Sequence, residues 1–318
     1  MEIHHFQHGW VTPAISYALS VLGSMLGLVC AVRLRSATGT GARTWWLALS
    51  AIAIGGTGIW TMHFVAMLGF GVVGTTIRYD VALTAASAIL AIAAVGLGML
   101  VVFGGTTATR PGPARIAIGG VLAGLGVAAM HYMGMYAMHL NGAISYGTGK
   151  VAASIAIAVL AATAALWLAA NVQRPVAIFG AALIMGVAVN GMHFTGMSAM
   201  SVHTRATATS PTGASGTSLL IPIGLTVLFG VLGLLYALMA APTEEDRAAA
   251  EYLASRRLGT PAAPAPAAPR PGSLPSASGL SASGRSASGP SASGGNQPGP
   301  RSSALGGGSW TYRDRESR

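Results

Sequence analysis

The chain has 318 residues, of which 52% are hydrophobic and only 8% are charged. Soluble domains carry about 25% charged residues, so this composition excludes an ordinary soluble fold and indicates a membrane protein. The net charge of +10 does not indicate nucleic-acid binding, because the basic residues lie in short loops between apolar runs or in a low-complexity tail. Cys30 is the only cysteine, which excludes an intrachain disulfide and a cysteine metal cluster.

Seven apolar runs are long enough to cross a bilayer, which takes about 20 residues in a helix. The N-terminus lacks the basic segment of a cleavable signal peptide, so we expect the first run to remain in the protein. We therefore predict an all-α membrane protein. Its seven transmembrane helices are expected at residues 12–32, 44–69, 80–103, 115–139, 151–170, 175–200 and 217–241.

The basic residues set the expected orientation, because Lys and Arg are enriched in cytoplasmic loops. The loops after the first, third and fifth runs carry Arg33, Arg35, Arg43, Arg110, Arg115 and Arg174. The loops after the second, fourth and sixth runs carry only Arg78, Lys150 and Arg205, whereas nine basic residues follow the seventh run. We therefore expect the N-terminus outside the cell and the C-terminus in the cytoplasm, with the protein in the cell membrane.

One short phrase occurs three times, at the ends of the second, fourth and sixth runs. The copies read Met-His-Phe-Val-Ala-Met at 62–67, Met-His-Tyr-Met-Gly-Met at 130–135 and Met-His-Phe-Thr-Gly-Met at 192–197. This spacing predicts three repeats, each an inward helix followed by an outward helix that ends in the motif. All three His would then lie at one depth near the outer face, where an intramembrane His usually signals function.

The seventh run has no motif and leads into the C-terminal part of the chain. We expect a membrane domain over residues 1–242 and a short cytoplasmic helix over 243–258. Residues 259–318 are rich in Pro, Ala, Ser and Gly, which cannot bury a core, so they are predicted to be disordered.

The motifs suit metal binding, because residues four apart share one face of a helix. An imidazole and a thioether then lie together in each copy, and this mixture favours copper, especially Cu(I). The predicted ligands are His63, Met67, His131, Met135, His193 and Met197.

Other side chains near the motifs extend this hypothesis. Asn190 lies three residues before His193 and is a candidate for orienting that imidazole, although interhelical hydrogen bonding is the alternative. Met138 and Met200 would lie on the same helical faces as the motif Met residues. The candidate additional ligands are Met138, Met200, His139, His4 and His5.

Two other functions remain open for the same residues. A haem b group could be held between helices by two of the motif His, although three His at one depth fit stacked haems poorly. A copper-transfer protein would use external His and Met to pass the ion inward. A retinal pigment is excluded because Lys150, the only lysine, lies in a loop. No nucleophile–base pair or phosphate loop is visible, so we do not expect an enzyme.

The triplicated motif, the seven helices and the orientation resemble the MHYT domain family of bacterial integral-membrane sensors. Residues 130–133 (Met-His-Tyr-Met) and 192–195 (Met-His-Phe-Thr) come near the family motif, whereas 62–65 (Met-His-Phe-Val) is a looser match. The Gly-Met that follows the motif is present at 134–135 and 196–197 but is Ala-Met at 66–67.

The resemblance implies a sensory domain over about residues 1–240. It implies copper bound by the motif His and Met residues, with a diatomic gas (O2, CO or NO) or the redox state as the signal. Relatives often carry the domain on a cyclic-di-GMP enzyme or a histidine kinase. This chain shows no such output module, so we expect it to act as a stand-alone domain that signals through a separate protein.

Overall fold

The computed structural model describes residues 3–4, 9–105, 111–203, 211–240, 249 and 252–253. In this part of the chain seven helical spans have the length and composition to cross a membrane, as predicted from the apolar runs. The spans are α1 (Val11–Ser36), α2–η1–α3 (Thr40–Met67), α4 (Val81–Phe103), α5 (Pro113–Tyr136), α6 (Thr148–Asn171), α7 (Pro175–Ser198) and α8 (Gly216–Met239). The protein is therefore a multi-pass, all-α membrane protein.

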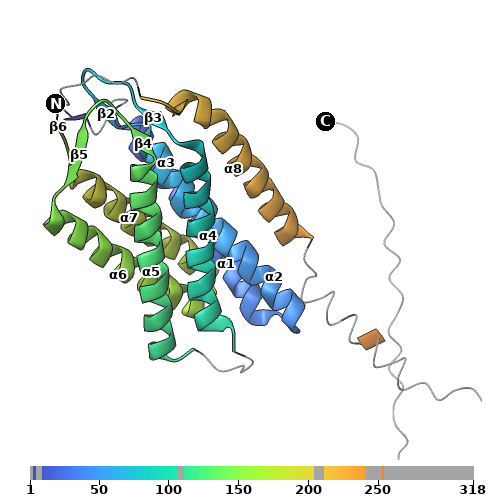
Figure 1. The fold of residues 1–318 in the computed structure, drawn as a ribbon. Helices are drawn as coiled ribbons and strands as arrows, with labels where there is room; N and C mark the ends of the chain where they lie inside the picture. Colours follow the sequence, from blue (N-terminus) through green and yellow to red (C-terminus); the bar gives the residue numbers. More distant parts are fainter. Residues whose placement is uncertain are drawn as a thin grey trace, which may run out of the picture. The chain divides into compact units, whose positions relative to one another are not determined.

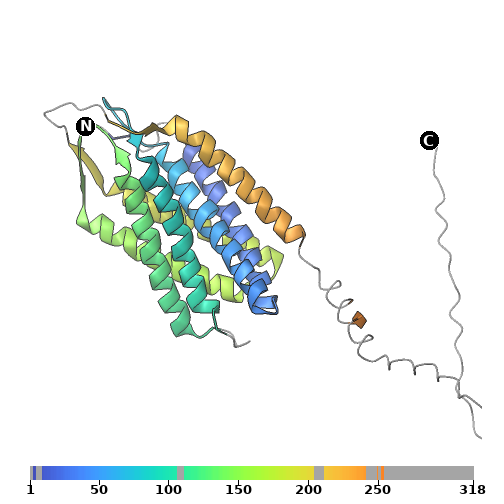
Figure 2. The ribbon, with the colours of Figure 1, turned by 45° about the vertical axis from the view of Figure 1, so that its right-hand side comes forward.

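Six of the spans form a closed ring in which each packs against two neighbours (Figures 1 and 2). Around the ring the order is α1, the second span, α4, α5, α6 and α7, and α7 closes against α1. Spans of opposite direction therefore alternate, and the three that end in the motif occupy every second place. Helix α8 lies outside this ring, against the second span, so the ring is built from the three predicted helix pairs alone.

The second span differs from the others because its middle part, η1 (Ile52–Thr61), is π-helical. It lies between α2 (Thr40–Ala51) and α3 (Met62–Met67). The hydroxyl of Thr61 donates to the carbonyl of Gly56, five residues earlier (2.9 Å). π-Helical turns are rare and often lie at functional sites, and this one leads directly into the first motif.

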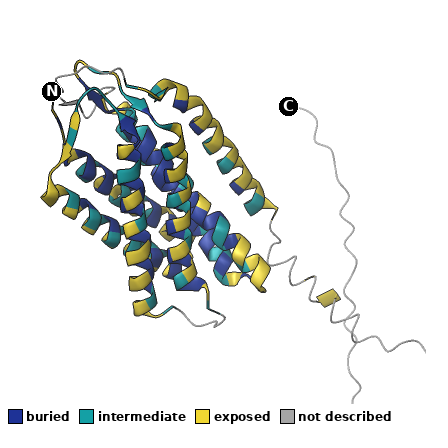
Figure 3. Ribbon diagram, viewed as in Figure 1, coloured by how far each residue is buried: buried dark blue, intermediate teal, exposed yellow. Residues whose placement is uncertain are grey.

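The faces of the helices are arranged as a bilayer requires (Figure 3). Large apolar side chains such as Ile89, Leu160 and Phe229 are exposed on the outer faces, where lipid replaces water. Small polar side chains lie inside, and Ser20, Ser87 and Ser154 have no exposed surface. Each of these serines takes part in a hydrogen bond to the side chain of a neighbouring span, respectively Asn190, Trp60 and Tyr132. Interhelical bonds of this kind replace the hydrophobic force that is missing in lipid.

Short antiparallel strands join the loops at the motif end of the ring (Figure 1). Strand β1 (Ile3–His4) pairs with β2 (Gly71–Val72), and β5 (Ala143–Tyr146) pairs with β6 (Met200–His203). Strand β3 (Arg78–Tyr79) pairs with both β4 (Met138–His139) and β7 (Ala214–Ser215). These strands tie all three repeats together above the motifs.

The strands correct one expectation from the sequence. The fourth and sixth spans end at Tyr136 and Ser198, so Met138 and Met200 do not continue the helical faces of the motifs. They lie in β4 and β6 instead, because strand pairing between loops takes over the backbone hydrogen bonds directly after each helix.

At the opposite end of the ring, three of the arginines bind the ends of helices. Arg35 donates to the carbonyls of Ala169 and Val172 at the end of α6. Arg43 and Arg115 donate to the carbonyls of Phe103 and Val101 at the end of α4, both at 2.9 Å. Basic groups are favourable at helix C-termini, so these residues stabilise the packing of the helix ends.

The expected cytoplasmic helix at 243–258 and the predicted disorder at 259–318 lie outside the described residues, apart from positions 249, 252 and 253. The expected orientation in the membrane stays a prediction.

Candidate metal centre

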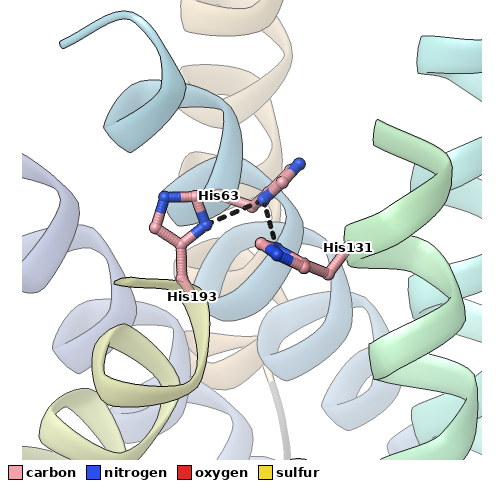
Figure 4. A group of neighbouring side chains, drawn as sticks. All are labelled: His63, His131 and His193. Atoms are coloured by element: carbon pink, nitrogen blue, oxygen red, sulfur yellow. Dashed lines mark hydrogen bonds between the residues drawn. The ribbon is translucent and has the colours of Figure 1, made fainter. Parts of the chain in front are cut away.

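The three motif histidines come together at the centre of the ring (Figure 4). His63 lies in α3, His131 in α5 and His193 in α7, so each repeat contributes one imidazole. Each residue is only 1% exposed. One nitrogen from each imidazole lies within 4.8 Å of the others. In the described part of the chain, no other three His, Cys, Asp or Glu side chains lie close enough together to hold a metal ion.

The three rings present the same nitrogen to the centre. The Nδ1 atom of His63 lies 3.0 Å from Nδ1 of His193 and 3.1 Å from Nδ1 of His131. The rings stand edge to face, with interplanar angles of 73°, 79° and 89°. The three imidazoles therefore converge with their planes roughly perpendicular to one another, and His63 contacts both of the others.

The second nitrogen of each ring has no hydrogen-bond partner among the described residues. The three Nε2 atoms are buried and unpaired. A buried polar group without a partner costs about 1–3 kcal/mol, and ordered native structures leave few such groups. Three unpaired nitrogens in one cluster indicate that these histidines do not serve to stabilise the fold.

The spacing of the Nδ1 atoms fits a metal ion. Imidazole nitrogens bind first-row metals at about 2.0–2.1 Å, which places the ligand nitrogens of a tetrahedral site about 3.3 Å apart. The observed separations of 3.0 and 3.1 Å are close to this value. The donor set is also suitable, because neutral imidazole binds copper and zinc, and no carboxylate takes part in the cluster.

A small apolar cavity of about 50 Å³ adjoins the three imidazoles. Its wall includes the Met that precedes each motif His, namely Met62, Met130 and Met192. Alanines of α6 (158, 161, 162 and 165) and the side chains of Ile54, Ile59, Val127, Met185, Ala188 and Val189 complete it. The lining is mostly apolar, which favours small neutral guests over ions.

This cavity was not predicted from the sequence. The sequence pattern singled out the Met at the end of each motif, not the Met that precedes each motif His. Met67, Met135 and Met197 lie one helical turn beyond the His and are at most 3% exposed. They are absent from the cavity wall, whereas the first Met of each motif is present. The signal was available, because that Met is repeated as faithfully as the His. Coordination by either set stays a prediction.

Three further candidate ligands lie in the strands at the motif end of the ring. His139 is partly exposed, and its Nδ1 pairs with the carbonyl of Thr212 at 3.1 Å. Met138 and Met200 are buried in β4 and β6. At the N-terminus, His4 lies in β1, where its backbone pairs with Gly71, and His5 lies outside the described residues.

Asn190 contacts α1 and its own helix rather than the imidazole cluster. Its Oδ1 accepts from the hydroxyl of Ser16, and its Nδ2 donates to Ser20, both at 3.0 Å. Nδ2 also donates to the carbonyl of Gly186 at 2.8 Å. The expected role in orienting His193 therefore gives way to the interhelical alternative.

Comparison with known proteins now gives this geometry a context. The family profile for MHYT, described as "Bacterial signalling protein N terminal repeat", matches residues 56–116 and 124–182. The matched segments contain the first two motifs and the spans that follow them, α4 and α6. The chain therefore contains MHYT repeats.

Relatives of the chain are bacterial signalling proteins. It is 40% identical over 194 residues to the "Bifunctional diguanylate cyclase/cyclic di-GMP phosphodiesterase MucR" of Pseudomonas aeruginosa, which covers 59% of this chain and 27% of that protein. It is 33% identical over 259 residues to an "Uncharacterized signaling protein" of Caulobacter vibrioides, covering 80% and 30%. It is 36% identical over 162 residues to the "Cyclic di-GMP phosphodiesterase NbdA" of P. aeruginosa, covering 49% and 20%.

The chain thus spans less than a third of the length of these MHYT relatives. No solved structure matches it. The comparisons identify a membrane domain of a signalling family. In this chain, each of the three motifs supplies one of the converging histidines.

Proposed function

We propose that this protein is a membrane sensor that binds one copper ion between His63, His131 and His193. The observation that supports it is the convergence of three buried Nδ1 atoms, two pairs of which are 3.0 and 3.1 Å apart. Thioether side chains of Met62, Met130 and Met192 line the cavity that adjoins the cluster, and a mixture of imidazole and thioether favours copper, especially as Cu(I). The buried Met residues at the motif ends lie one helical turn beyond each His.

The signal is proposed to be a diatomic gas (O2, CO or NO) or the redox state. Copper would supply an open coordination position for such a gas and a one-electron couple for a redox signal. The adjoining apolar cavity supports the gas, because about 50 Å³ next to the imidazoles suits a small neutral molecule and disfavours a charged one. A haem b group fits less well, because its macrocycle has no room among three rings that contact one another.

The protein's own part in signalling follows from the ring. Each imidazole belongs to a different span, and these spans otherwise make few contacts with one another across the ring. A change in how the three nitrogens are held therefore shifts three helices relative to one another. We propose that this shift reaches a separate partner protein, and the names of the relatives suggest an enzyme of cyclic-di-GMP metabolism.

The test is the metal content of the detergent-purified full chain, reconstituted with Cu(I). The variant has His63, His131 and His193 changed to Ala, and the control has the exposed His203 changed to Ala. We expect stoichiometric copper in the wild type and the control, and none in the triple variant. Helical content by circular dichroism verifies that all three proteins are folded. Copper retained by a folded triple variant, or no copper in the wild type, would overturn the proposal.

Binding of the signal is tested on the copper-loaded protein by titration with CO, followed by the infrared C–O stretch. We expect one CO per copper. An unchanged spectrum, together with a reversible Cu(II)/Cu(I) transition, would favour redox sensing over gas sensing.

A further inference from the structure

Two motif glycines lie directly against the outward nitrogens of the histidine cluster. A Cβ atom built on Gly134 would lie 2.3 Å from Nε2 of His63 and 3.0 Å from its Cδ2. A Cβ atom built on Gly196 would lie 2.3 Å from Nε2 of His131 and 3.0 Å from its Cδ2. Real Cβ atoms do not approach so closely, so an imidazole and a larger side chain cannot both be accommodated here without a shift.

These contacts follow the order of the repeats. The ring of the first motif lies against the glycine of the second, and the ring of the second lies against the glycine of the third. In each case the contacted glycine lies three residues after that motif's own His. The glycine therefore acts on the neighbouring repeat rather than on its own, which a single motif examined alone would not reveal.

The contact also decides which nitrogen is available. A metal must come within about 2.0–2.1 Å of the nitrogen and needs further ligands around it. The backbone of the next motif's helix closes the Nε2 side of His63 and His131, where the described residues offer no hydrogen-bond partner. On the Nδ1 side the other imidazoles lie at 3.0 and 3.1 Å. Histidines can bind metals through either nitrogen, so the choice here is made by packing.

On the Nε2 side, no hydrogen bond among the described residues holds the rings in this orientation. The Nε2 atoms of His63 and His131 have no partner among the described residues. In metal-binding histidines the second nitrogen usually donates to a carboxylate, a carbonyl or water, which fixes the ring. Here the close approach to glycine replaces that bond.

We propose that Gly134 and Gly196 are positioning residues that turn the Nδ1 edges of His63 and His131 to the centre of the cluster, so that the metal is held by Nδ1 and each metal-bound ring carries its proton on Nε2. The involvement of a metal rests on the function proposed above. The orientation of the rings does not, because it follows from contacts within the protein.

The metal-free protein has a testable proton pattern of its own. Two hydrogen bonds meet at Nδ1 of His63, one from His131 and one from His193. If both donors share the single lone pair of His63 Nδ1, His131 and His193 carry their protons on Nδ1 and His63 carries its proton on Nε2. Binding of Cu(I) to all three Nδ1 atoms then moves the protons of His131 and His193 to Nε2.

The test uses full-length protein with ¹⁵N-labelled histidine, studied by NMR with and without Cu(I), which is diamagnetic. The variants are Gly134→Ala and Gly196→Ala. Gly191→Ala is the matched control, because Gly191 lies in the same helix as His193 and a Cβ there would meet open space. We expect Cu(I) on Nδ1 of all three histidines in the wild type and in the control. In Gly134→Ala we expect loss of this signature at His63 and at least a tenfold loss of Cu(I) affinity, and likewise at His131 in Gly196→Ala.

Two results would overturn the proposal: Cu(I) bound through Nε2 of His63 or His131, or an unchanged Nδ1 signature in both glycine variants. If the wild type binds no Cu(I), the function proposed above fails and the orientation is still tested without metal. The wild type and Gly191→Ala should then show ¹⁵N–¹⁵N coupling across the Nδ1 hydrogen bonds, and Gly134→Ala should lose it at His63. Coupling retained in Gly134→Ala would refute the positioning role.

A second measurement covers the case in which Gly134→Ala fails to fold. If the substitution acts through the His63 ring, it should be harmless once that ring is removed. We expect Gly134→Ala to lower the melting temperature of the wild type but to leave that of a His63→Ala background as little changed as Gly191→Ala does. An equal loss in both backgrounds would show that the glycine serves helix packing only.

Discussion

The Nδ1 atoms of His63 and His193 lie 3.0 Å apart although 130 positions separate them in the chain. His131 lies 3.1 Å from His63 on the other side, so His63 is the member that contacts both partners. The three imidazoles meet because the motifs lie at the same depth in three spans from three repeats. The faces of these spans that carry the motif His point to the centre of the helical ring. The cluster is therefore a product of the whole six-helix ring rather than of any one motif.

The central place of His63 predicts an unequal effect of single substitutions. His63→Ala removes both short Nδ1 contacts, whereas His131→Ala and His193→Ala leave one of them. We expect copper affinity, measured by competition with a Cu(I) chelator, to fall most in His63→Ala, by at least a hundredfold. His203→Ala serves as the control, because that side chain is exposed and pairs with Ser145. Equal losses in all three single variants would contradict the asymmetry.

Filling the cavity should separate gas binding from copper binding. Ala162 of α6 lies in the cavity wall, and Ala162→Leu adds three carbon atoms to a space of about 50 Å³. We expect CO affinity of the copper-loaded protein to fall at least tenfold with copper content unchanged. Ala164→Leu is the matched control, since Ala164 is exposed on the same helix. The same CO affinity in both variants would indicate that the gas binds elsewhere.

Asn190 should matter for stability and not for the metal. Asn190→Ala removes the bonds to Ser16, Ser20 and the carbonyl of Gly186, and interhelical bonds in membranes contribute about 0.6–1.7 kcal/mol each. We expect the free energy of unfolding in mixed micelles to fall by about 1–3 kcal/mol. Asn171→Ala, at an exposed site, should have little effect. Copper content should equal that of the wild type, and its loss would restore the role beside His193 that the sequence suggested.

Tyr79 should make the protein sensitive to alkaline pH. This residue precedes the α4 span, is 3% exposed, and its ring centroid lies 6.0 Å from that of Phe64 in the first motif. Burial away from water raises the pKa of Tyr79 above the ordinary value of 10.0. Below pH 10 both the folded and the unfolded states keep the phenol proton. Above it the unfolded state loses the proton while the folded state retains it, so unfolding becomes easier as the pH rises.

The expected result is a fall in melting temperature above about pH 10 that is weaker in Tyr79→Phe. Tyr136→Phe is the matched control, because Tyr136 is 74% exposed. A wild-type alkaline transition that Tyr79→Phe leaves unaltered would assign the sensitivity to another group.

Hydropathy was enough to predict the seven spans, because a membrane helix must be apolar along its whole length. The triplicated motif also predicted which histidines matter. It could not predict whether they form one site or three, since that depends on how the spans pack around the ring. Nor could it predict the π-helical segment before His63 or the strands that take Met138 and Met200 off the helices. Both depend on contacts between distant segments rather than on local sequence.

The glycine contacts illustrate the same limit. The sequence shows Gly134 and Gly196 at matched positions, but only the structure shows that each lies against the histidine of the preceding motif. The first motif has Ala66 at this position. A repeat pattern identifies equivalent positions, whereas the partner of each position is set by the arrangement of the helices.

Because each helix pair contributes one nitrogen to the cluster, the site also depends on how the chain is inserted into the membrane. A chain in which any one pair inserts in the wrong direction, or fails to insert, brings at most two imidazoles to the centre. Three donors are then available only to a correctly threaded molecule. Metal would therefore bind only to a fully inserted molecule, and a misassembled copy would give no signal.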